Sequence, residues 1–266
     1  MDEQVFDGQL GQETTTISTW YLLLLGILPV ILLAFYVYRK DKNKEPIGML
    51  LKAFMYGVAT VPTVLLIHGF FSLIGVYQLV NLLPSTRAFI SAALVEEGTK
   101  FFFLKRLVWN NKEFDERFDG IVYATFVSLG FACVENLMYI FNYVPSEMAL
   151  TTSISRGIFA VPAHFLFAVI MGYYFGLARF SVGSKQIVYL GLALLMPILF
   201  HGGYDYFLMA AEFVSSFSPA LSGLLTICFY IFDIVLWRVA MKNMRKHQEE
   251  DKLFAANNWM DIYIQH

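Results

Sequence analysis

Glutamate and histidine side chains stand inside otherwise apolar stretches of this sequence, where they could carry out hydrolysis. They are Glu96, Glu97, Glu135, His164 and His201. A charged side chain at membrane depth costs a few kcal/mol, so such residues usually line the interior of a bundle and serve a function. Two imidazoles with one or more carboxylates form a ligand set that Zn²⁺ uses in hydrolases, with an open position for water. The residue types therefore indicate a metal site or a water activated by carboxylate and imidazole groups.

Spacing along the chain pairs some of these groups. Residues four apart share a helix face, so Glu96 faces Lys100 and His201 faces Asp205. A carboxylate one turn from a histidine can accept its second ring N–H, which leaves the other nitrogen facing a metal or a substrate. Adjacent Glu96 and Glu97 point about 100° apart, so we expect different roles for them. One would bind a metal or water, and the other would hold the structure or move protons.

The elements that carry these groups are predicted to lie in a membrane. Of the 266 residues, 58% are hydrophobic and 15% are charged, and the mean hydropathy is +0.58. Ordinary soluble domains are only about 45–50% apolar, which excludes that class. The net charge of -2 gives no electrostatic reason to expect a nucleic-acid partner. Cys133 and Cys228 both lie in apolar stretches, so no disulfide framework is expected.

Apolar runs define the predicted fold, because about 20 helical residues cross a hydrocarbon core of about 30 Å. We expect an all-α polytopic membrane bundle of about seven transmembrane helices, near residues 17–38, 49–76, 86–107, 119–144, 153–178, 186–211 and 220–241. One transmembrane domain would cover 17–241, between an extracytoplasmic N-terminus (1–16) and a cytoplasmic tail (242–266). Gly172 and Gly176, spaced as two small residues one turn apart, predict a close helix–helix contact.

Basic residues fall almost entirely on one side of these spans. Of the 19 Lys and Arg residues, only Arg87 and Arg156 fall on the other side, and Lys100 lies within a span. The positive-inside rule then places the N-terminus outside and the C-terminus in the cytoplasm. Acidic residues precede the first span, the reverse of a signal peptide's basic start, so we expect that span to remain as an anchor.

Four candidate groups share one depth in this arrangement. At 1.5 Å rise per residue they fall roughly 13–17 Å from the outer boundary: Glu97, Glu135, His164 and His201. Two of these helices run inward and two run outward, so no repeated sequence pattern produces the match. For a single buried ionisable residue, a helix–helix hydrogen bond or a structural ion pair is as good an explanation as a function. One structural ion pair that we expect joins Lys100 and Asp233. The convergence of the whole set favours function.

Four short motifs follow one another in these spans: Glu96-Glu97-Gly98-Thr99-Lys100, Phe131-Ala132-Cys133-Val134-Glu135-Asn136, Val161-Pro162-Ala163-His164 and His201-Gly202-Gly203-Tyr204-Asp205. In this order the chain resembles the PrsW family of intramembrane proteases, distantly similar to the CAAX-prenyl and bacteriocin-processing protease superfamily. The resemblance covers about residues 44–206. The wider superfamily has the motifs EExxxR and FxxxH, whereas the PrsW branch has EExxK and FxxxE. This sequence has the PrsW forms, which argues against prenylated CAAX substrates.

The resemblance implies a multi-pass endopeptidase of the bacterial plasma membrane, so that 17–241 is a transmembrane protease domain. Its partners would be the lipid bilayer and a single-span membrane protein such as an anti-sigma factor. It would make the first (site-1) cut on the extracytoplasmic side, near the membrane. A second intramembrane protease would then complete release of the sigma factor.

The expected reaction is peptide-bond hydrolysis by a water held between carboxylate and imidazole groups. Glu96 is our expected general base, with Lys100 beside it, although the assignment between Glu96 and Glu97 stays open. Asp205 would orient His201. In the metal version, zinc would be held by Glu97, His164 and His201, with Glu135 as a fourth ligand or as a partner of one. A metal-free version is also open, in which a glutamate activates water and the histidines with Asn136 stabilise the oxyanion.

Two functions from other classes would use the same residues. A proton-coupled transporter would need intramembrane carboxylates and histidines, but it predicts paired inverted repeats with broken helices, and the sequence has no such symmetry. A heptahelical sensor would match seven spans with an outside N-terminus. A retinal sensor needs a Schiff-base lysine in the bundle, and the last span, 220–241, has none.

Overall fold

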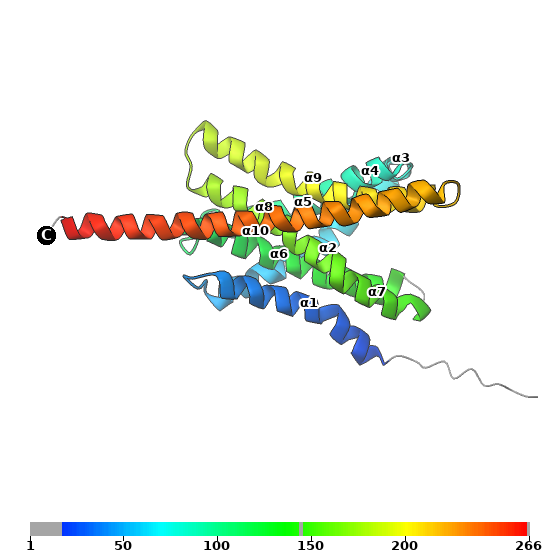
Figure 1. Cartoon of the computed structure of the whole chain (residues 1–266), viewed down its shortest axis with the longest axis horizontal. Coiled ribbons are helices and arrows are strands. Elements are labelled where there is room, and N and C mark those ends of the chain that lie inside the picture. Colours follow the sequence, from blue (N-terminus) through cyan, green and yellow to red (C-terminus); the bar gives the residue numbers. More distant parts are fainter. Residues whose placement is uncertain (1–17, 144–145, 265–266) are drawn as a thin grey trace, which may run out of the picture.

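The computed structural model describes residues 18–143 and 146–264, which form helices joined by short connections (Figure 1). The long helices are α1 (Thr19–Lys40), α2 (Ile47–Leu73), α5 (Val95–Val108), α6 (Arg117–Met138), α8 (Val161–Arg179), α9 (Ser184–Val214) and α10 (Pro219–Ile264). Shorter helices are α3 (Val76–Val80), α4 (Pro84–Thr86), α7 (Ala149–Ser155) and the 3₁₀ turn η3 (Ser146–Met148). Three π-helical segments are η1 (Arg87–Leu94), η2 (Tyr139–Tyr143) and η4 (Arg156–Ala160). Since no described residue forms a strand, the all-α prediction is confirmed.

Within the described residues, six helical segments are long and apolar enough to cross a membrane: Thr19–Lys40, Ile47–Leu73, Arg117–Asn142, Ala149–Arg179, Ser184–Val214 and Pro219–Leu253. Each coincides with one of the seven expected spans. The remaining span, expected at 86–107, is helical as α4, η1 and α5, but it has too many charges to count as a lipid-facing helix: Arg87, Glu96, Glu97, Lys100, Lys105 and Arg106. Its central charges are buried, so protein rather than lipid surrounds them.

Helices α6 and α8 form the centre of the bundle. Within their membrane-spanning segments 67% and 78% of the most apolar stretch is buried, against 11% for α10. α2 and α1 pack on α6, α9 packs on α8, and α5 lies among α2, α6 and α9. Figure 1 shows α10, in orange and red, running the length of the molecule and past its end. The central pair therefore provides the most enclosed surfaces for polar side chains.

The close approach of α6 and α8 depends on glycine. A Cβ atom added at Gly172 would lie 2.4 Å from the carbonyl oxygen of Gly120, and one at Gly176 would lie 2.3 Å from that of Arg117. Both distances are far inside van der Waals contact, so the two backbones meet only because these residues lack side chains. The predicted contact at Gly172 and Gly176 is confirmed, and it fixes α8, which carries His164, against α6, which carries Glu135.

The segment predicted as a tail, 242–266, continues α10 without a break as far as Ile264. Asp251 accepts hydrogen bonds from the backbone N–H groups of Arg117 (3.2 Å) and Phe118 (2.9 Å), in the first turn of α6, where helical partners are missing. α10 therefore closes the end of the bundle at which α6 begins. The predicted N-terminal segment, 1–16, lies outside the described residues.

Replacing Gly172 with alanine tests the α6–α8 contact. We expect Gly172→Ala to lower the free energy of unfolding by about 1–3 kcal/mol, because the new methyl group forces the two backbones apart. Gly191→Ala in α9 is the matched control, since a Cβ there meets no atom within 4 Å. Alanine also has the higher helix propensity, so the control should be neutral or slightly stabilising. Thermal unfolding in detergent measures both, and equal losses would contradict the packing described.

Candidate active site

Four helices and their π-helical flanks position the candidate residues. α5 carries Glu96, Glu97 and Lys100, α6 carries Glu135, α8 carries His164, and α9 carries His201 and Asp205. η1 ends just before Glu96, η2 begins four residues after Glu135, and η4 ends just before the turn of α8 that holds His164. A π-helical turn inserts a residue and re-aims the side chains around it, and such turns are frequent at functional sites. Apolar periodicity gave no indication of these three segments.

Glu96, Glu97, His164 and His201 meet in the interior of the bundle. Each offers one ligand atom, and these four atoms all lie within 4.8 Å of one another. Glu97 is fully buried, and Glu96 is 9% exposed. The sequence placed three of these residues at one depth, and the structure adds that they also face one another.

Lys100 lies at the centre of this cluster. Its Nζ is 2.8 Å from Glu97 Oε1, 3.4 Å from Glu96 Oε2 and 3.2 Å from His164 Nδ1. It also lies 3.9 Å from the centroid of the Phe131 ring, in a cation–π contact. The expected ion pair between Lys100 and Asp233 is not among the ion pairs of the described residues. The ammonium instead lies between two carboxylates and reduces the repulsion that they would otherwise have in an apolar interior.

Hydrogen bonds fix the tautomer of His164. A lysine ammonium can only donate, so Nδ1, which faces Lys100, accepts and carries no proton. Nε2 lies 2.9 Å from Glu135 Oε2, which accepts its N–H. Glu135 thus orients the imidazole, one of the two roles proposed for it from the sequence.

His201 lies between two carboxylates. Nδ1 is 2.9 Å from Glu97 Oε1, and Nε2 is 3.4 Å from Asp205 Oδ2. The ring stacks on Phe167 with centroids 4.7 Å apart, which fixes its plane. The contact with Asp205 has the four-residue spacing expected from the sequence. Both ring nitrogens face acceptors, so the ring donates to both only when it is doubly protonated.

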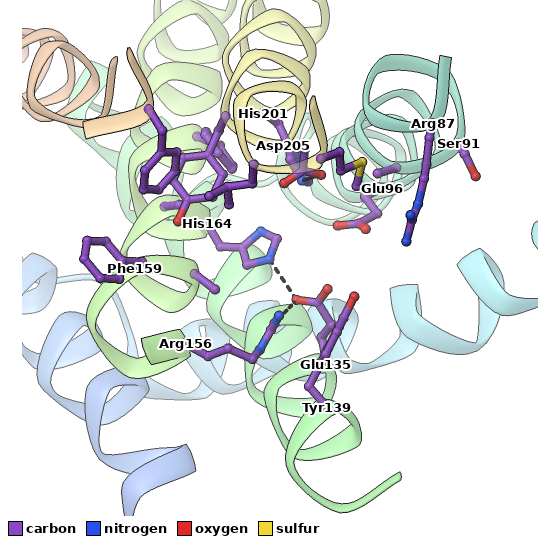
Figure 2. Close-up of a pocket in the computed structure, with 18 of the residues that line it drawn as sticks. Arg87, Ser91, Glu96, Glu135, Tyr139, Arg156, Phe159, His164, His201 and Asp205 are labelled. Atoms are coloured by element: carbon purple, nitrogen blue, oxygen red, sulfur yellow. Dashed lines mark hydrogen bonds and ion pairs between the residues drawn. The ribbon is translucent and has the colours of Figure 1, made fainter. Parts of the chain in front are cut away.

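A cavity of about 590 Å³ opens beside the cluster (Figure 2). Glu96, Glu135, Arg156, His164, His201 and Asp205 all line it. Figure 2 shows Glu96 and Glu135 converging on the cavity near His164. Glu97 and Lys100 lie behind this wall. The two adjacent glutamates therefore differ in their access to the cavity. Glu96 can contact a substrate or water there, whereas Glu97 cannot do so without rearrangement.

Arg156 and Tyr139 belong to the site but were missed in the sequence. Arg156 Nη2 is 2.8 Å from Glu135 Oε2, and its Nε is 3.0 Å from Asn136 Oδ1. The guanidinium lies 3.9 Å over the ring of Tyr139. The signals available were the four-residue spacing of Tyr139 from Glu135 and the rarity of arginine on the predicted outer side. Asn136 donates from Nδ2 to the carbonyl of Gly26, so its amide supports Arg156 and points away from the cavity.

The residues present are suited to holding a metal ion. Carboxylate and imidazole are ligands that Zn²⁺ accepts, and the four groups are close enough to share one ion. Glu97 Oε2 is buried and has no hydrogen-bond partner among the described residues, which is costly unless another group or an ion occupies that side. A ligating imidazole nitrogen must be unprotonated, so metal binding would release a proton from His201 if both of its nitrogens carry one.

Comparison with known proteins gives a consistent result. Residues 45–237 match the family model described as PrsW family intramembrane metalloprotease. Protease PrsW of Geobacillus kaustophilus is 40% identical over 192 residues, which cover 72% of this chain and 81% of the relative. Protease PrsW of Clostridioides difficile is 33% identical over 239 residues, or 89% and 95% of the two chains. That of Bacillus subtilis is 37% identical over 188 residues, or 70% and 81%. No solved structure matches the chain.

A double-mutant cycle tests the link between Arg156 and Glu135. We expect Arg156→Met and Glu135→Gln each to destabilise the protein by about 2–4 kcal/mol, because each leaves a buried charge without its partner. The double variant should cost less than the sum by about 1–3 kcal/mol. Arg87→Met is the matched control, since Arg87 lines the same cavity but makes no ion pair with Glu135. Additive losses in thermal unfolding would show that the pair is not coupled.

Proposed function

This chain belongs to the PrsW family of intramembrane proteases, so it is a peptide-bond hydrolase in a bacterial membrane, and we propose that it makes the first (site-1) cut in a single-span membrane protein such as an anti-sigma factor. The observation that supports this most strongly is the meeting of two glutamates and two histidines within 4.8 Å, beside a cavity large enough for an extended peptide segment. Backbone in a helix is shielded from attack, so the substrate must unwind before its amide reaches that cavity.

The proposed side of cleavage follows from the charge distribution. The connections at 41–46 and 109–116 and the end of α10 lie on the predicted cytoplasmic side, where most Lys and Arg residues occur. By helix rise, the side chains of one set lie roughly 13–17 Å from the opposite boundary: Glu97, Glu135, His164 and His201. A peptide entering from the extracytoplasmic side would therefore be cut near the middle of the bilayer, since half of a hydrocarbon core of about 30 Å is roughly 15 Å.

Side chains of this site have distinct proposed roles. Glu96 lines the cavity and is our general base, which takes the proton of the attacking water and passes it to the leaving amine. His164, oriented by Glu135, and His201, oriented by Asp205, face the same space. Lys100 holds Glu97 and Glu96 in place from behind.

Zinc is the proposed cofactor, held by Glu97, His164 and His201, with Glu96 close enough to be a ligand in place of acting as the base. When bound there, zinc would supply Lewis acidity for the scissile carbonyl and activation of a water. Glu135 is better placed as the partner of His164 than as a ligand, because its Oε2 is already shared by His164 and Arg156.

A metal-free mechanism is the second candidate, and one observation favours it. The Lys100 ammonium already stands between Glu97, Glu96 and His164, where a cation would be needed to bring them together. In that version Glu96 activates the water, and doubly protonated His201 gives up its longer contact with Asp205 to donate from Nε2 to the oxyanion. Lys100 then supplies the positive charge that the metal would otherwise provide.

Cleavage of a single-span protein with an extracytoplasmic domain, in reconstituted membranes, tests the proposed activity. We expect Glu96→Gln, Glu97→Gln, His164→Ala and His201→Ala each to lose at least about 100-fold in rate, since each removes a general base, a ligand or an oxyanion donor. Asp233→Asn is the matched control, because Asp233 is also a partly buried intramembrane carboxylate but lies outside the site. Cleavage that survives all four substitutions would place the reaction elsewhere.

Metal removal separates the two mechanisms. In the zinc version, active protein contains about one zinc per chain, chelation abolishes cleavage, and zinc restores it. In the same version Lys100→Met retains zinc, because the ion compensates Glu96 and Glu97 once the ammonium is gone. Full activity in protein without zinc, together with the loss of folded protein in Lys100→Met, would establish the lysine-centred mechanism instead.

A further inference from the structure

A second cluster of carboxyl groups lies at the opposite end of α6 from the active site. It consists of Asp41 and Glu45, in the connection between α1 and α2, and of Glu116 and Asp119, at the start of α6. Sixteen residues separate Asp119 from Glu135 on this helix, a distance of roughly 24 Å along its axis. The cluster is therefore separate from the hydrolytic site.

Three of these carboxylates are close enough to share one ion. Asp41, Glu116 and Asp119 each offer one oxygen, and the three oxygens lie within 4.8 Å of one another. Asp41 is 2% exposed and Asp119 is 0% exposed. Glu45 is buried beside them and accepts a hydrogen bond from the hydroxyl of Tyr123. So much negative charge in a buried position is unfavourable unless a cation or protons compensate it.

The backbone holds these carboxylates in place and leaves some of their oxygens without a donor. Asp119 Oδ2 accepts from the N–H groups of Glu116 (2.7 Å) and Asp115 (3.1 Å), and Asp41 Oδ2 accepts from that of Glu45 (3.2 Å). No donor among the described residues reaches Asp119 Oδ1 or Asp41 Oδ1, although both atoms are buried. The capping of α6 accounts for one oxygen of Asp119, and a backbone contact within the α1–α2 connection accounts for one oxygen of Asp41, which leaves the other oxygen of each side chain unexplained.

Basic residues lie near the cluster, but among the described residues they form no ion pair with its carboxylates. Lys44 directs its Nζ to the carbonyl oxygens of Tyr38 and Asp41 and to the face of the Tyr38 ring. Lys40, Lys42 and Lys252 line a neighbouring cavity with Glu116. Within the described part of the chain, none of these ammonium groups forms an ion pair with a carboxylate of the cluster, since the ion pairs found involve other residues.

We propose that Asp41, Glu116 and Asp119 bind a hard divalent cation, Mg²⁺ or Ca²⁺, which joins the α1–α2 connection to the start of α6. Oxygen-only ligands with two or more carboxylates are the set that these ions prefer, and the absence of imidazole and thiolate disfavours zinc. The same turn of α6 receives Asp251 from α10 through hydrogen bonds, so the ion would join two distant segments at a point where a third is already attached. Under the proposed orientation this site faces the cytoplasm.

A shared proton is the competing explanation. Burial raises the pKa of Glu45 to about 7, and the charges of Glu45 and Asp119 lie close enough to repel each other. Neutralisation by protons would make the stability of this end depend on pH and leave it independent of divalent ions.

Thermal unfolding of the purified full-length protein in detergent, with MgCl₂ or CaCl₂ against NaCl at matched ionic strength, tests the proposal. We expect one divalent ion or both to raise Tm saturably, by about 5 °C at a hundred times Kd. Asp41→Asn and Asp119→Asn should abolish the shift, because each amide removes the charge while keeping the shape and the capping oxygen. Glu113→Gln, an exposed acid in the same connection as Glu116, is the matched control and should keep it.

Glu97→Gln separates this site from the catalytic cluster, and it should also keep the full shift. A wild-type protein whose Tm responds to neither ion would overturn the proposal, whether or not the aspartate variants fold. So would a shift that persists in Asp41→Asn, or a Tm that follows pH near 7 and is unchanged by either ion.

Discussion

The need to keep ionised side chains away from lipid determines how this bundle is built. Lys100 and the two adjacent glutamates lie on α5, whose central charges could not face hydrocarbon. The Lys100 ammonium contacts both Glu97 and Glu96, and His201 makes a second contact with Glu97 at the same oxygen, Oε1. Because each charge has a partner on the same helix or a neighbouring one, α5 must be surrounded by α2, α6 and α9. Removing any one member leaves another buried charge without compensation.

The tight helix packing at the centre of the bundle and the polar networks toward the two ends of α6 have different roles. Glycines at the α6–α8 contact let the backbones touch, so Glu135 and His164 are held at hydrogen-bonding distance by two stiff elements. The π-helical segments lie at the ends of these elements and interrupt the regular turn beside the site. A site on helices supported in this way can hold its side chains in place before a substrate arrives.

Much of this could be predicted from residue type and spacing. Apolar length gave the spans, and four-residue spacing gave the contacts of Glu96 with Lys100 and of His201 with Asp205. The span expected at 86–107 does not meet the criterion of length and hydropathy for a membrane-crossing helix. Its charges are compensated by contacts with neighbouring helices, which hydropathy does not describe. For the same reason the expected ion pair of Lys100 with Asp233 was wrong, although its contact with Glu96 was confirmed: similar depth suggested Asp233, whereas rotation about the helix axis aims the ammonium at Glu97 and His164.

Arg156 and the carboxylates at the far end of α6 show the same limit of sequence reasoning. Arg156 is one basic residue on a predicted outer side, and only its place against Glu135 and Tyr139 gives it a role. Asp41 and Asp119 are 78 positions apart in the numbering and read as ordinary connector charges until the fold brings them together. Local spacing predicts contacts within one helix, whereas contacts between helices depend on their rotation and on which of them are neighbours.

Zinc-edge X-ray absorption of the purified active protein most directly tests whether Glu97, His164 and His201 form one metal-holding hydrolytic site. We expect one zinc per chain with only nitrogen and oxygen ligands, at about 2.0–2.1 Å, and two of them imidazoles. The imidazole signal should fall by half in His201→Ala. A spectrum with sulfur ligands near 2.3 Å, or no zinc in fully active protein, would contradict this description of the site.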